Sequence, residues 1–573
     1  MKKILQNIIL VIAGFVIGSC QKDLPNQPKP NQSPSTRLWL ASSVTLNETS
    51  SRQHAYWYGE DPDGYVKGFL IATPESISTS SVAFPDTFTY SWTTKNDSII
   101  SLPLIKARSI FTIIARAVDN TFKENLLLPE GAIIRLATPS YWDKNFNGSF
   151  DGGDVLLSSL NSSIDTKSAA QLLPIRNTPP KVFYSVNPID SATIQQPDTT
   201  FTVATFSWYG TDLDGNHTIS NFRIALNDSG PNKRWFSVSG GAVKLITLIA
   251  PRSVTNGATG EVDADVYTGT FPTMQFRGKI AGLKLDANNV LYLQARDVAG
   301  DSSATITMPS TPASKKWYVK KPKSKMLFVL DYGVTNNTEK NAVVPYYRNI
   351  FSNNVILAGS LKQFDVLDIV NNQPAFLNPA LIKTLQLYNV VFWATNRTPS
   401  IVPAQIGLFN YTQSGGKVIF STTFQTAISY AELRALNDFS PIDSTTSDTT
   451  YFTNNNVPPT NADRSISKNV KVLELASGYP ELTVDSLNVS GSTVISQTVN
   501  VRRIYKRTDS KYIYRIDSSR VLPPRYIGSP HIASIDNDKR FVFFALPLHI
   551  LNGNTKNLPL FFEQVIENEF GLN

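Results

Sequence analysis

Oxygen-bearing side chains recur at regular spacing over the twelve residues from Asp143 to Asp154. Oxygen-bearing residues occupy positions 1, 3, 5, 9 and 12 of this stretch, glycine occupies position 6, and an apolar residue occupies position 8. Calcium takes about six to eight oxygen ligands, and this spacing wraps them around one point. We therefore predict a Ca²⁺ site. Its ligands would be Asp143, Asn145, Asn147, Ser149 through its backbone carbonyl, Asp151 and Asp154.

The stretch follows the loop pattern of an EF-hand, but two of its features differ. Position 12 is Asp154, whose side chain is shorter than the usual glutamate, and the preceding residues 138–142 lack helical periodicity. Together with Val155–Leu157, the loop resembles a dockerin-type calcium loop, although dockerins carry two such loops and we find one. A surface turn rich in Asn, Asp and Gly is the alternative. A single Ca²⁺ ion in such an insertion would be structural.

A second group of carboxylates belongs to an internal repeat. The pattern W-Y-G-x-D-x-D-G occurs at Trp57–Gly64 and again at Trp208–Gly215, 151 residues later. Each copy is followed by strands in which apolar and polar residues alternate, and a later strand of each copy ends in another acidic turn. The acids of these turns are Asp61, Asp63 and Asp119 in the first copy and Asp212, Asp214 and Asp297 in the second.

Short alternating strands separated by Gly, Asp and Pro turns predict antiparallel β-sandwiches. In such a sandwich the loops after the second and sixth strands lie at the same end, so three carboxylates of each copy would converge there. Three carboxylates suit a hard cation such as Ca²⁺. Because Asp-Gly is also a preferred turn pair, we favour a turn over a metal site at these positions.

The order of these strands resembles a fibronectin type III or related immunoglobulin-like module. The resemblance covers roughly residues 37–315 and implies that Trp57 and Trp208 are the core tryptophans of the second strand. We expect sandwich 1 over residues 37–177, with the calcium-loop-like insertion near 139–170. Sandwich 2 is expected over residues 178–315.

The pattern changes after a Lys-rich linker at residues 316–325. Apolar runs then alternate with amphipathic stretches, which predicts an α/β domain with a parallel sheet over residues 326–573 and a β-rich insertion near 440–525. The segment Leu387–Thr422, with Arg540–Pro547 and Leu558–Phe570, resembles a flavodoxin-like domain of the class I glutamine amidotransferase type.

That resemblance implies a nucleophilic cysteine after a central strand, and the sequence has none there. Its single cysteine is Cys20, so cysteine-based amide chemistry is excluded. The remaining catalytic candidates are Asp331, Ser421 and His531. Asp331 follows a predicted strand, where ligands of open α/β sheets bind, but an acid at that position often caps a helix instead. His531 has the simpler interpretation of a loop residue.

The N-terminus predicts export. Lys2 and Lys3 precede the apolar run Ile8–Ile17, which at ten residues is too short to span a bilayer of about 30 Å. The segment Ile17–Cys20 resembles the bacterial lipoprotein box. This implies cleavage after residue 19, covalent lipid (diacylglycerol and a fatty acyl group such as palmitate) on Cys20 and a flexible, proline-rich tether at residues 20–36. An ordinary signal peptide cleaved elsewhere is the alternative.

Composition excludes several functions. One Cys and four His exclude Cys-ligated zinc and iron–sulfur sites. The formal charge of +8 falls to +6 without Lys2 and Lys3, so nucleic acid is not an expected partner. The basic stretch Arg502–Arg515 predicts a hairpin that contacts acidic polysaccharide or an envelope protein, or else a charged edge ribbon.

We therefore expect an outer-membrane lipoprotein of the cell envelope, on its periplasmic or surface-exposed face, that binds a glycan or protein partner. The sandwiches would be spacers, and the α/β domain would have no catalytic role. An envelope carbohydrate hydrolase and a structural component of a surface assembly are the alternatives. A hydrolase predicts Asp331 in a pocket beside a second carboxylate or His531. A binding protein predicts a shallow groove or an exposed aromatic patch.

Overall fold

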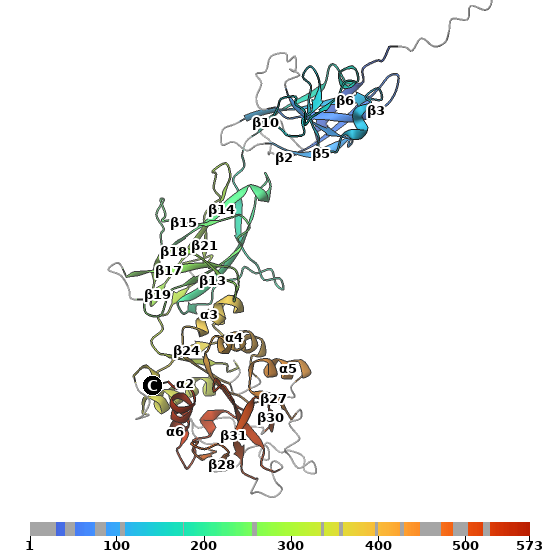
Figure 1. The fold of residues 1–573 in the computed structure, drawn as a ribbon. Helices are drawn as coiled ribbons and strands as arrows, with labels where there is room; N and C mark the ends of the chain where they lie inside the picture. The colour runs from blue at the N-terminus through green and yellow to red at the C-terminus, as the bar shows by residue number, and fades with distance from the viewer. Residues whose placement is uncertain are drawn as a thin grey trace, which may run out of the picture. The chain divides into compact units, whose positions relative to one another are not determined.

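The computed structural model describes residues 30–40, 52–74, 88–102, 109–175, 177–254, 260–313, 315–333, 337–353, 359–395, 399–423, 429–446, 471–484, 502–518 and 528–572 (Figure 1). Cys20, the predicted signal peptide and most of the predicted tether lie outside these ranges. The chain divides into two compact units. Unit 1 comprises Met1–Pro179, Asp212–Thr218 and Asp297–Asp301, and unit 2 comprises Pro180–Thr211, Ile219–Arg296 and Ser302–Asn573.

The first sandwich combines two antiparallel sheets of the described residues. One sheet has the order β1-β2-β5, formed by β1 (Ser35–Leu40), β2 (Arg52–Glu60) and β5 (Asp97–Ser101). The other has the order β10-β6-β3-β4-β7-β8-β9, formed by β10 (Ala169–Ile175), β6 (Ser109–Asp119), β3 (Val66–Ala72), β4 (Thr89–Thr93), β7 (Ile133–Arg135), β8 (Tyr141–Trp142) and β9 (Val155–Leu156). Between the sheets, the buried Trp57 packs edge-on against Phe69, with ring centroids 6.3 Å apart.

The second sandwich repeats this arrangement. One sheet has the order β11-β13-β16-β17-β18, formed by β11 (Lys181–Tyr184), β13 (Val203–Thr211), β16 (Leu245–Ile249), β17 (Glu261–Thr268) and β18 (Gln275–Lys284). The facing sheet has the order β15-β14-β20-β21, formed by β15 (Phe236–Ser239), β14 (Ile219–Leu226), β20 (Leu291–Asp297) and β21 (Ile306–Met308). A smaller sheet joins β12 (Thr199–Thr200), β22 (Tyr318–Val319) and β19 (Ala287–Asn288). Trp208 is buried against Phe222, as predicted for the core tryptophan.

The glycine of each W-Y-G pattern lets the sheets approach closely. A Cβ atom on Gly59 would lie 2.8 Å from the Cβ of Ala117 and 3.1 Å from the ring of Phe69. A Cβ atom on Gly210 would lie 2.8 Å from Ile219 and 3.1 Å from the ring of Phe222. The repeated tripeptide therefore specifies a tryptophan that fills the core and a glycine that leaves room for the aromatic ring of the next strand.

The C-terminal region contains a mixed sheet of the order β24-β23-β25-β26-β33-β32-β31-β28-β29. The strands from β24 to β33 pair in parallel, and the remaining pairs are antiparallel. Their bounds are β24 (Asp365–Asp368), β23 (Met326–Leu330), β25 (Val390–Ala394), β26 (Lys417–Ser421), β33 (Phe541–Phe544), β32 (His531–Asp536), β31 (Ser510–Ile516), β28 (Lys471–Glu474) and β29 (Leu482–Thr483).

Helices cover both faces of this sheet, so β23 and β25 are buried along their whole length. The described helices are α2 (Asn337–Ser352), α3 (Ile382–Leu385), α4 (Ile401–Gln413), α5 (Tyr430–Phe439) and α6 (Leu558–Glu563). The short helical segments are η1 (Glu124–Leu127), η2 (Leu160–Ser162), η3 (Asn216–Thr218), η4 (Gly359–Lys362), η5 (Leu377–Leu381), η7 (Leu548–Ile550) and η8 (Gln564–Glu569). Among the described helices, none has both the length and the hydropathy that a bilayer crossing needs.

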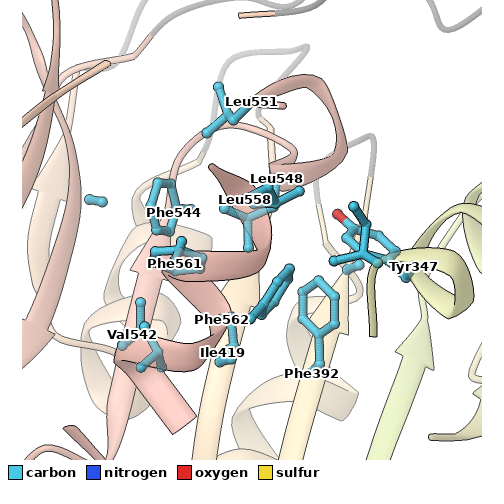
Figure 2. Packing of buried hydrophobic residues seen from close by; sticks show 14 of the residues in the cluster. Tyr347, Phe392, Ile419, Val542, Phe544, Leu548, Leu551, Leu558, Phe561 and Phe562 are labelled. Atoms are coloured by element: carbon cyan, nitrogen blue, oxygen red, sulfur yellow. The ribbon is translucent and has the colours of Figure 1, made fainter. Parts of the chain in front are cut away.

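On one face of the sheet, aromatic rings of strands and helices pack together. Figure 2 shows Tyr347 of α2, Phe392 of β25 and Phe562 of α6 meeting above the sheet. The ring centroids of Tyr347 and Phe392 are 4.8 Å apart, and those of Phe392 and Phe562 are 5.4 Å apart. The opposite face packs Trp393 and Phe420 in the same core as residues of α3, α4 and α5. These two cores hold the carboxyl edge of the parallel strands in place.

The basic stretch Arg502–Arg515 does not form the predicted hairpin. Strand β30 (Ile504–Lys506) pairs with β27 (Ile442–Thr445), whereas β31 pairs with β28 and β32 of the main sheet. Arg502 is fully buried, and its guanidinium donates to the carbonyl oxygen of Thr446 at 2.6 Å. The prediction was wrong because the buried residues of β30 and β31 belong to different sheets, which the local alternation of residues does not reveal.

Candidate functional site

The predicted calcium loop connects β8 to β9, whose antiparallel pairing sets Tyr141 opposite Leu156. Its side chains turn inward. Oδ2 of Asp143 accepts from the backbone N–H of Gly148 at 3.1 Å and from Nε of Arg135 at 3.1 Å. The loop is therefore folded around Asp143, which is fully buried.

Side-chain oxygens of Asn147, Asp151 and Asp154 accept N–H groups of the loop itself. The amides of Asn145 and Asn147 donate to Oδ2 of Asp151 at 2.9 and 2.7 Å, and Asp154 accepts the backbone N–H of Lys144 at 3.0 Å. The backbone N–H of Ser149 donates to Oδ1 of Asn147 at 2.8 Å. Hydrogen bonds from the Gly153 N–H, Asn145 and Asn147 lower the pKa of Asp151. Within the described ranges, no group of three or more His, Cys, Asp or Glu side chains is arranged to hold a metal ion.

The acidic turns of the repeat do converge, and each receives donors from the segment before its sandwich. In the first copy, Asn31 donates its amide to Oδ2 of Asp119 at 2.8 Å, and the backbone N–H of Gln32 donates to Oδ2 of Asp63 at 3.1 Å. Burial raises the pKa of Asp61, and the carboxylates of Asp63 and Asp119 raise it further. The acidic turns at this end of the first sandwich are thus held by N–H donors.

The second copy repeats these bonds. Asn177 donates to Oδ2 of Asp297 at 2.7 Å, and Thr178 donates its backbone N–H to Oδ2 of Asp214 at 2.8 Å. Burial raises the pKa of Asp212, and the charges of Asp214 and Asp297 contribute to the increase. The sequence contained a signal for this, namely the matching N-x-x-P patterns at residues 31–34 and 177–180, which our sequence analysis did not connect to the acidic turns.

Asp331 lies at the carboxyl end of β23, as predicted, and is fully buried. Its Oδ2 accepts from Nε1 of Trp393 at 3.1 Å and from the backbone N–H of Ser400 at 2.6 Å, while its Oδ1 accepts the hydroxyl of Ser400 at 2.7 Å. Ser400 is the N-cap residue immediately before α4. This geometry is that of a carboxylate that fixes the start of a helix.

Ser421 and His531 lie at the same edge of the sheet but are not close to Asp331. In the strand order, β26 is two strands and β32 four strands away from β23, which corresponds to about 10 and 19 Å at the usual strand spacing. The buried hydroxyl of Ser421 donates to the carbonyl oxygen of Leu546 and accepts the N–H of Leu548. The structure therefore does not bring the three predicted catalytic residues together.

A different polar cluster lies at this edge. Nε2 of His549 is 3.4 Å from Oε1 of Glu339, and its Nδ1 is 3.3 Å from the hydroxyl of Tyr332. All three side chains are almost completely buried. No local pattern in the sequence indicates this cluster, because its members come from three segments far apart in the chain. Its burial leaves it no exposed face for a substrate.

An exposed row of aromatic rings crosses the outer side of the sheet β1-β2-β5. The register sets Trp39 directly opposite Tyr56, and their rings are stacked at 6.0 Å with an interplanar angle of 12°. The ring of Tyr56 in turn stacks on His54 at 4.3 Å and 22°. Trp39 is 48% exposed. Three nearly parallel rings thus form a strip on the surface of unit 1.

Polar groups border this strip. Nε2 of His54 is 2.6 Å from Oδ2 of Asp97 on β5, and Nδ1 is 3.3 Å from the hydroxyl of Tyr56. One rung further along the strands, Arg37 lies opposite Tyr58, which is 51% exposed. We call Arg37, Trp39, His54, Tyr56, Tyr58 and Asp97 the aromatic face. Its signal in the sequence was the alternation of His54, Tyr56 and Tyr58 with the small or buried residues between them.

The second sandwich carries a related pair. Phe183 of β11 lies opposite Tyr209 of β13, in the same rung as Arg37 and Tyr58 of the first sandwich, and the two rings stack at 5.3 Å and 24°. Both are exposed, and they line a surface groove of about 430 Å³ that extends to Thr307 of β21. Both copies thus expose a stacked pair of rings on equivalent strands, one rung apart in the two sandwiches.

No family model and no curated protein matches this chain. Solved structures of fibronectin type III-like modules match about half of it. The fibronectin(III)-like modules of CbhA from Clostridium thermocellum cover 50% of this chain and 94% of their own at 10% identity, with a TM-score of 0.15. The FN1–FN3 domains of chicken CNTN1 cover 49% and 99% at 10% identity, with a TM-score of 0.13. The architecture described above rests on the strand pairings of the chain itself.

Proposed function

We propose that this protein is a lipid-anchored envelope protein that binds a glycan through the aromatic face of its first sandwich. The observation that supports this is the row formed by Trp39, Tyr56 and His54. An aromatic ring carries negative charge on its face, which attracts the C–H bonds on the apolar side of a sugar ring. The row offers a sugar the end faces and outward edges of its stacked rings, and Asp97 and Arg37 place hydrogen-bonding groups at its borders.

The anchor in this proposal is lipid on Cys20, and the tether is residues 20–36, which would hold the sandwiches away from the outer membrane. We infer that the sandwiches belong to the fibronectin type III class and that the α/β domain is flavodoxin-like and non-catalytic. The parallel order β24-β23-β25-β26-β33 is 2-1-3-4-5 in chain order, which is the order of flavodoxin-like folds. The structural roles of Asp331 and Ser421 support a domain without catalysis.

We also propose one structural Ca²⁺ ion in the loop 143–154. Oδ1 of Asp143 is buried and has no hydrogen-bond partner among the described residues, so it offers an oxygen ready for a cation. To bind the ion, Asn145 and Asn147 would have to turn their amide oxygens, which accept the N–H groups of Asn147 and Ser149, toward the centre of the loop. The carboxylates of Asp151 and Asp154 would complete the ligand set.

Binding assays with the full chain, purified in detergent, test the glycan proposal. Affinity electrophoresis against a panel of neutral polysaccharides should retard the protein on at least one of them. Trp39→Ala and Tyr56→Ala should each weaken that binding by about tenfold, because each removes a stacking ring. Tyr65→Ala is the matched control, since Tyr65 is also an exposed tyrosine of unit 1 but lies outside the aromatic face.

Two outcomes would overturn the proposal. One is binding that persists unchanged in Trp39→Ala and Tyr56→Ala. The other is that no polysaccharide of the panel retards the protein, whereas an envelope protein binds the wild type and not these variants. In that case the aromatic face is a contact site for a protein.

A further inference from the structure

A pocket of about 400 Å³ in unit 2 is lined by basic side chains from three segments. Lys320 and Lys323 come from the segment that precedes β23, Arg348 comes from α2, and Lys362 comes from η4. We call these four residues the basic pocket. Its volume lies within the range of about 300–1,000 Å³ that is typical of small-molecule sites.

Within the described residues, few negative groups offset the positive charge of the basic pocket. In the described part of the chain, Lys320, Arg348 and Lys362 form no ion pair. Nζ of Lys323 is 4.0 Å from Oδ2 of Asp286, but both groups are well exposed, and such pairs contribute little. Among the described residues, the pocket therefore presents four cations against a single lining carboxylate, that of Asp365.

The carboxylate that lines the pocket is already engaged. Oδ2 of Asp365 accepts the backbone N–H groups of Lys323 and Ser324 at 2.7 and 3.0 Å, and Asp365 is almost completely buried. These bonds fix the segment before β23 against β24. Asp365 thus builds the wall of the pocket and positions Lys323.

Aromatic rings hold two of the cations. The guanidinium of Arg348 lies 5.9 Å from the ring centroid of Phe364, and Nζ of Lys320 lies 5.7 Å from that of Phe201. Cation–π contacts of this kind restrict a side chain while leaving its N–H groups free to donate. The cations are therefore arranged before a ligand arrives, which lowers the entropic cost of binding.

We propose that the basic pocket binds an anionic sugar, that is, a sugar ring carrying a carboxylate or a sulfate. Oxyanions accept the N–H groups of Arg and Lys in strong, charge-assisted hydrogen bonds. The pocket has room for a ring as well as for its charged group, which is more than inorganic phosphate needs. The inference goes beyond the proposed function, because it adds a separate site in unit 2 whose ligand is an acidic sugar.

Calorimetric titration of the full chain with a sulfated oligosaccharide, an oligogalacturonate, a neutral oligosaccharide and inorganic phosphate tests this. We expect saturable binding of at least one acidic oligosaccharide, weaker at high salt because screening reduces the attraction. Arg348→Gln and Lys362→Gln should each lower that affinity by about tenfold, as expected when one charge-assisted hydrogen bond is lost. Lys325→Gln and Lys316→Gln are the matched controls, since both lysines are exposed near the pocket but do not line it.

Several outcomes would overturn the inference. They are equal effects of the control and pocket substitutions, binding of inorganic phosphate alone, and no saturable binding of any acidic oligosaccharide. The test separates the two proposals, because Trp39→Ala leaves the basic pocket intact and Arg348→Gln leaves the aromatic face intact. Acidic binding that is lost in Trp39→Ala but kept in Arg348→Gln would overturn this inference alone.

Discussion

Asn177 donates its side-chain amide to the carboxylate of Asp297 at 2.7 Å, just as Asn31 donates to Asp119 at 2.8 Å. The next residue donates its backbone N–H to the other acidic turn of the same copy, Gln32 to Asp63 and Thr178 to Asp214. The segment in front of each sandwich is therefore bonded to the turns at one end of it. These bonds give the acidic turns of the repeat a structural role that the sequence alone left open.

Removing the hydrogen bond from Asn177 to Asp297 should destabilise unit 1. We expect Asn177→Ala to lower the free energy of unfolding by about 1–3 kcal/mol, because Asp297 loses a donor in a buried setting. Urea denaturation measures this. Asn341→Ala, on an exposed position of α2, is the control and should be neutral. An equal effect of both substitutions would show that the bond to Asp297 contributes nothing.

The glycine of the W-Y-G pattern should tolerate no side chain. Gly59→Ala and Gly210→Ala should each cost about 1–3 kcal/mol, because the added methyl group would lie 2.8 Å from a neighbouring carbon atom. Thermal unfolding measures the loss. Gly152→Ala is the control, since a Cβ atom there meets nothing within 4 Å. Stability that is unchanged in Gly59→Ala would mean that the sheets can separate without cost.

His531 should make the C-terminal region that contains it less stable in mild acid. Burial lowers the pKa of His531, and the charges of Arg503 and Arg515 lower it further. The unfolded chain, with a histidine pKa near about 6.5, then binds more protons than the folded one. Stability should fall as the pH drops below about 6.5 and level off below the folded-state pKa.

Urea denaturation at pH 7.5 and pH 5 measures this effect. His531→Gln should reduce the difference in stability between the two pH values, whereas His217→Gln serves as the comparison. A difference that is the same in His531→Gln and in the wild type would assign the acid sensitivity to other groups.

Calcium should stabilise the first sandwich. A ligand that binds only the folded state raises the unfolding temperature with its concentration. We expect a higher unfolding temperature in millimolar Ca²⁺ and no such increase in Asp143→Asn, which loses the charge of the buried ligand. Magnesium is the control, because it demands a more rigid octahedral site. An unfolding temperature that does not respond to Ca²⁺ or to a chelator would remove the ion from the proposal.

The sequence specified the local features well and the long-range ones poorly. The burial of Trp57 and Trp208 was implied by the resemblance to fibronectin type III modules, and the structure confirms it. The strand Met326–Leu330 followed from its continuous apolar run. By contrast, the stacking of Trp39 on Tyr56 depends on the register between β1 and β2, which is not written in either strand alone.

The candidate sites show the same limit. The inward-turning side chains of the loop 143–154 could be foreseen, because spacing within twelve residues decides them. The basic pocket could not, since Lys320, Arg348 and Lys362 come together only when α2 and η4 pack beside the segment before β23. Asp331 was placed correctly at the end of a strand, but its bond to Ser400 depends on where α4 begins.

The hydrogen bond from Asn31 to Asp119 and its counterpart from Asn177 to Asp297 bear on how the repeat arose. A duplication copies whatever it carries, and here both copies include the asparagine ahead of the first strand as well as the acidic turns that receive it. If the repeat arose by duplication, the duplicated segment began before the first β-strand and included this asparagine. A fragment that contains one sandwich should therefore begin before Asn31 or Asn177. A fragment that begins at the first strand would lose the hydrogen bond from that asparagine to its acidic turn.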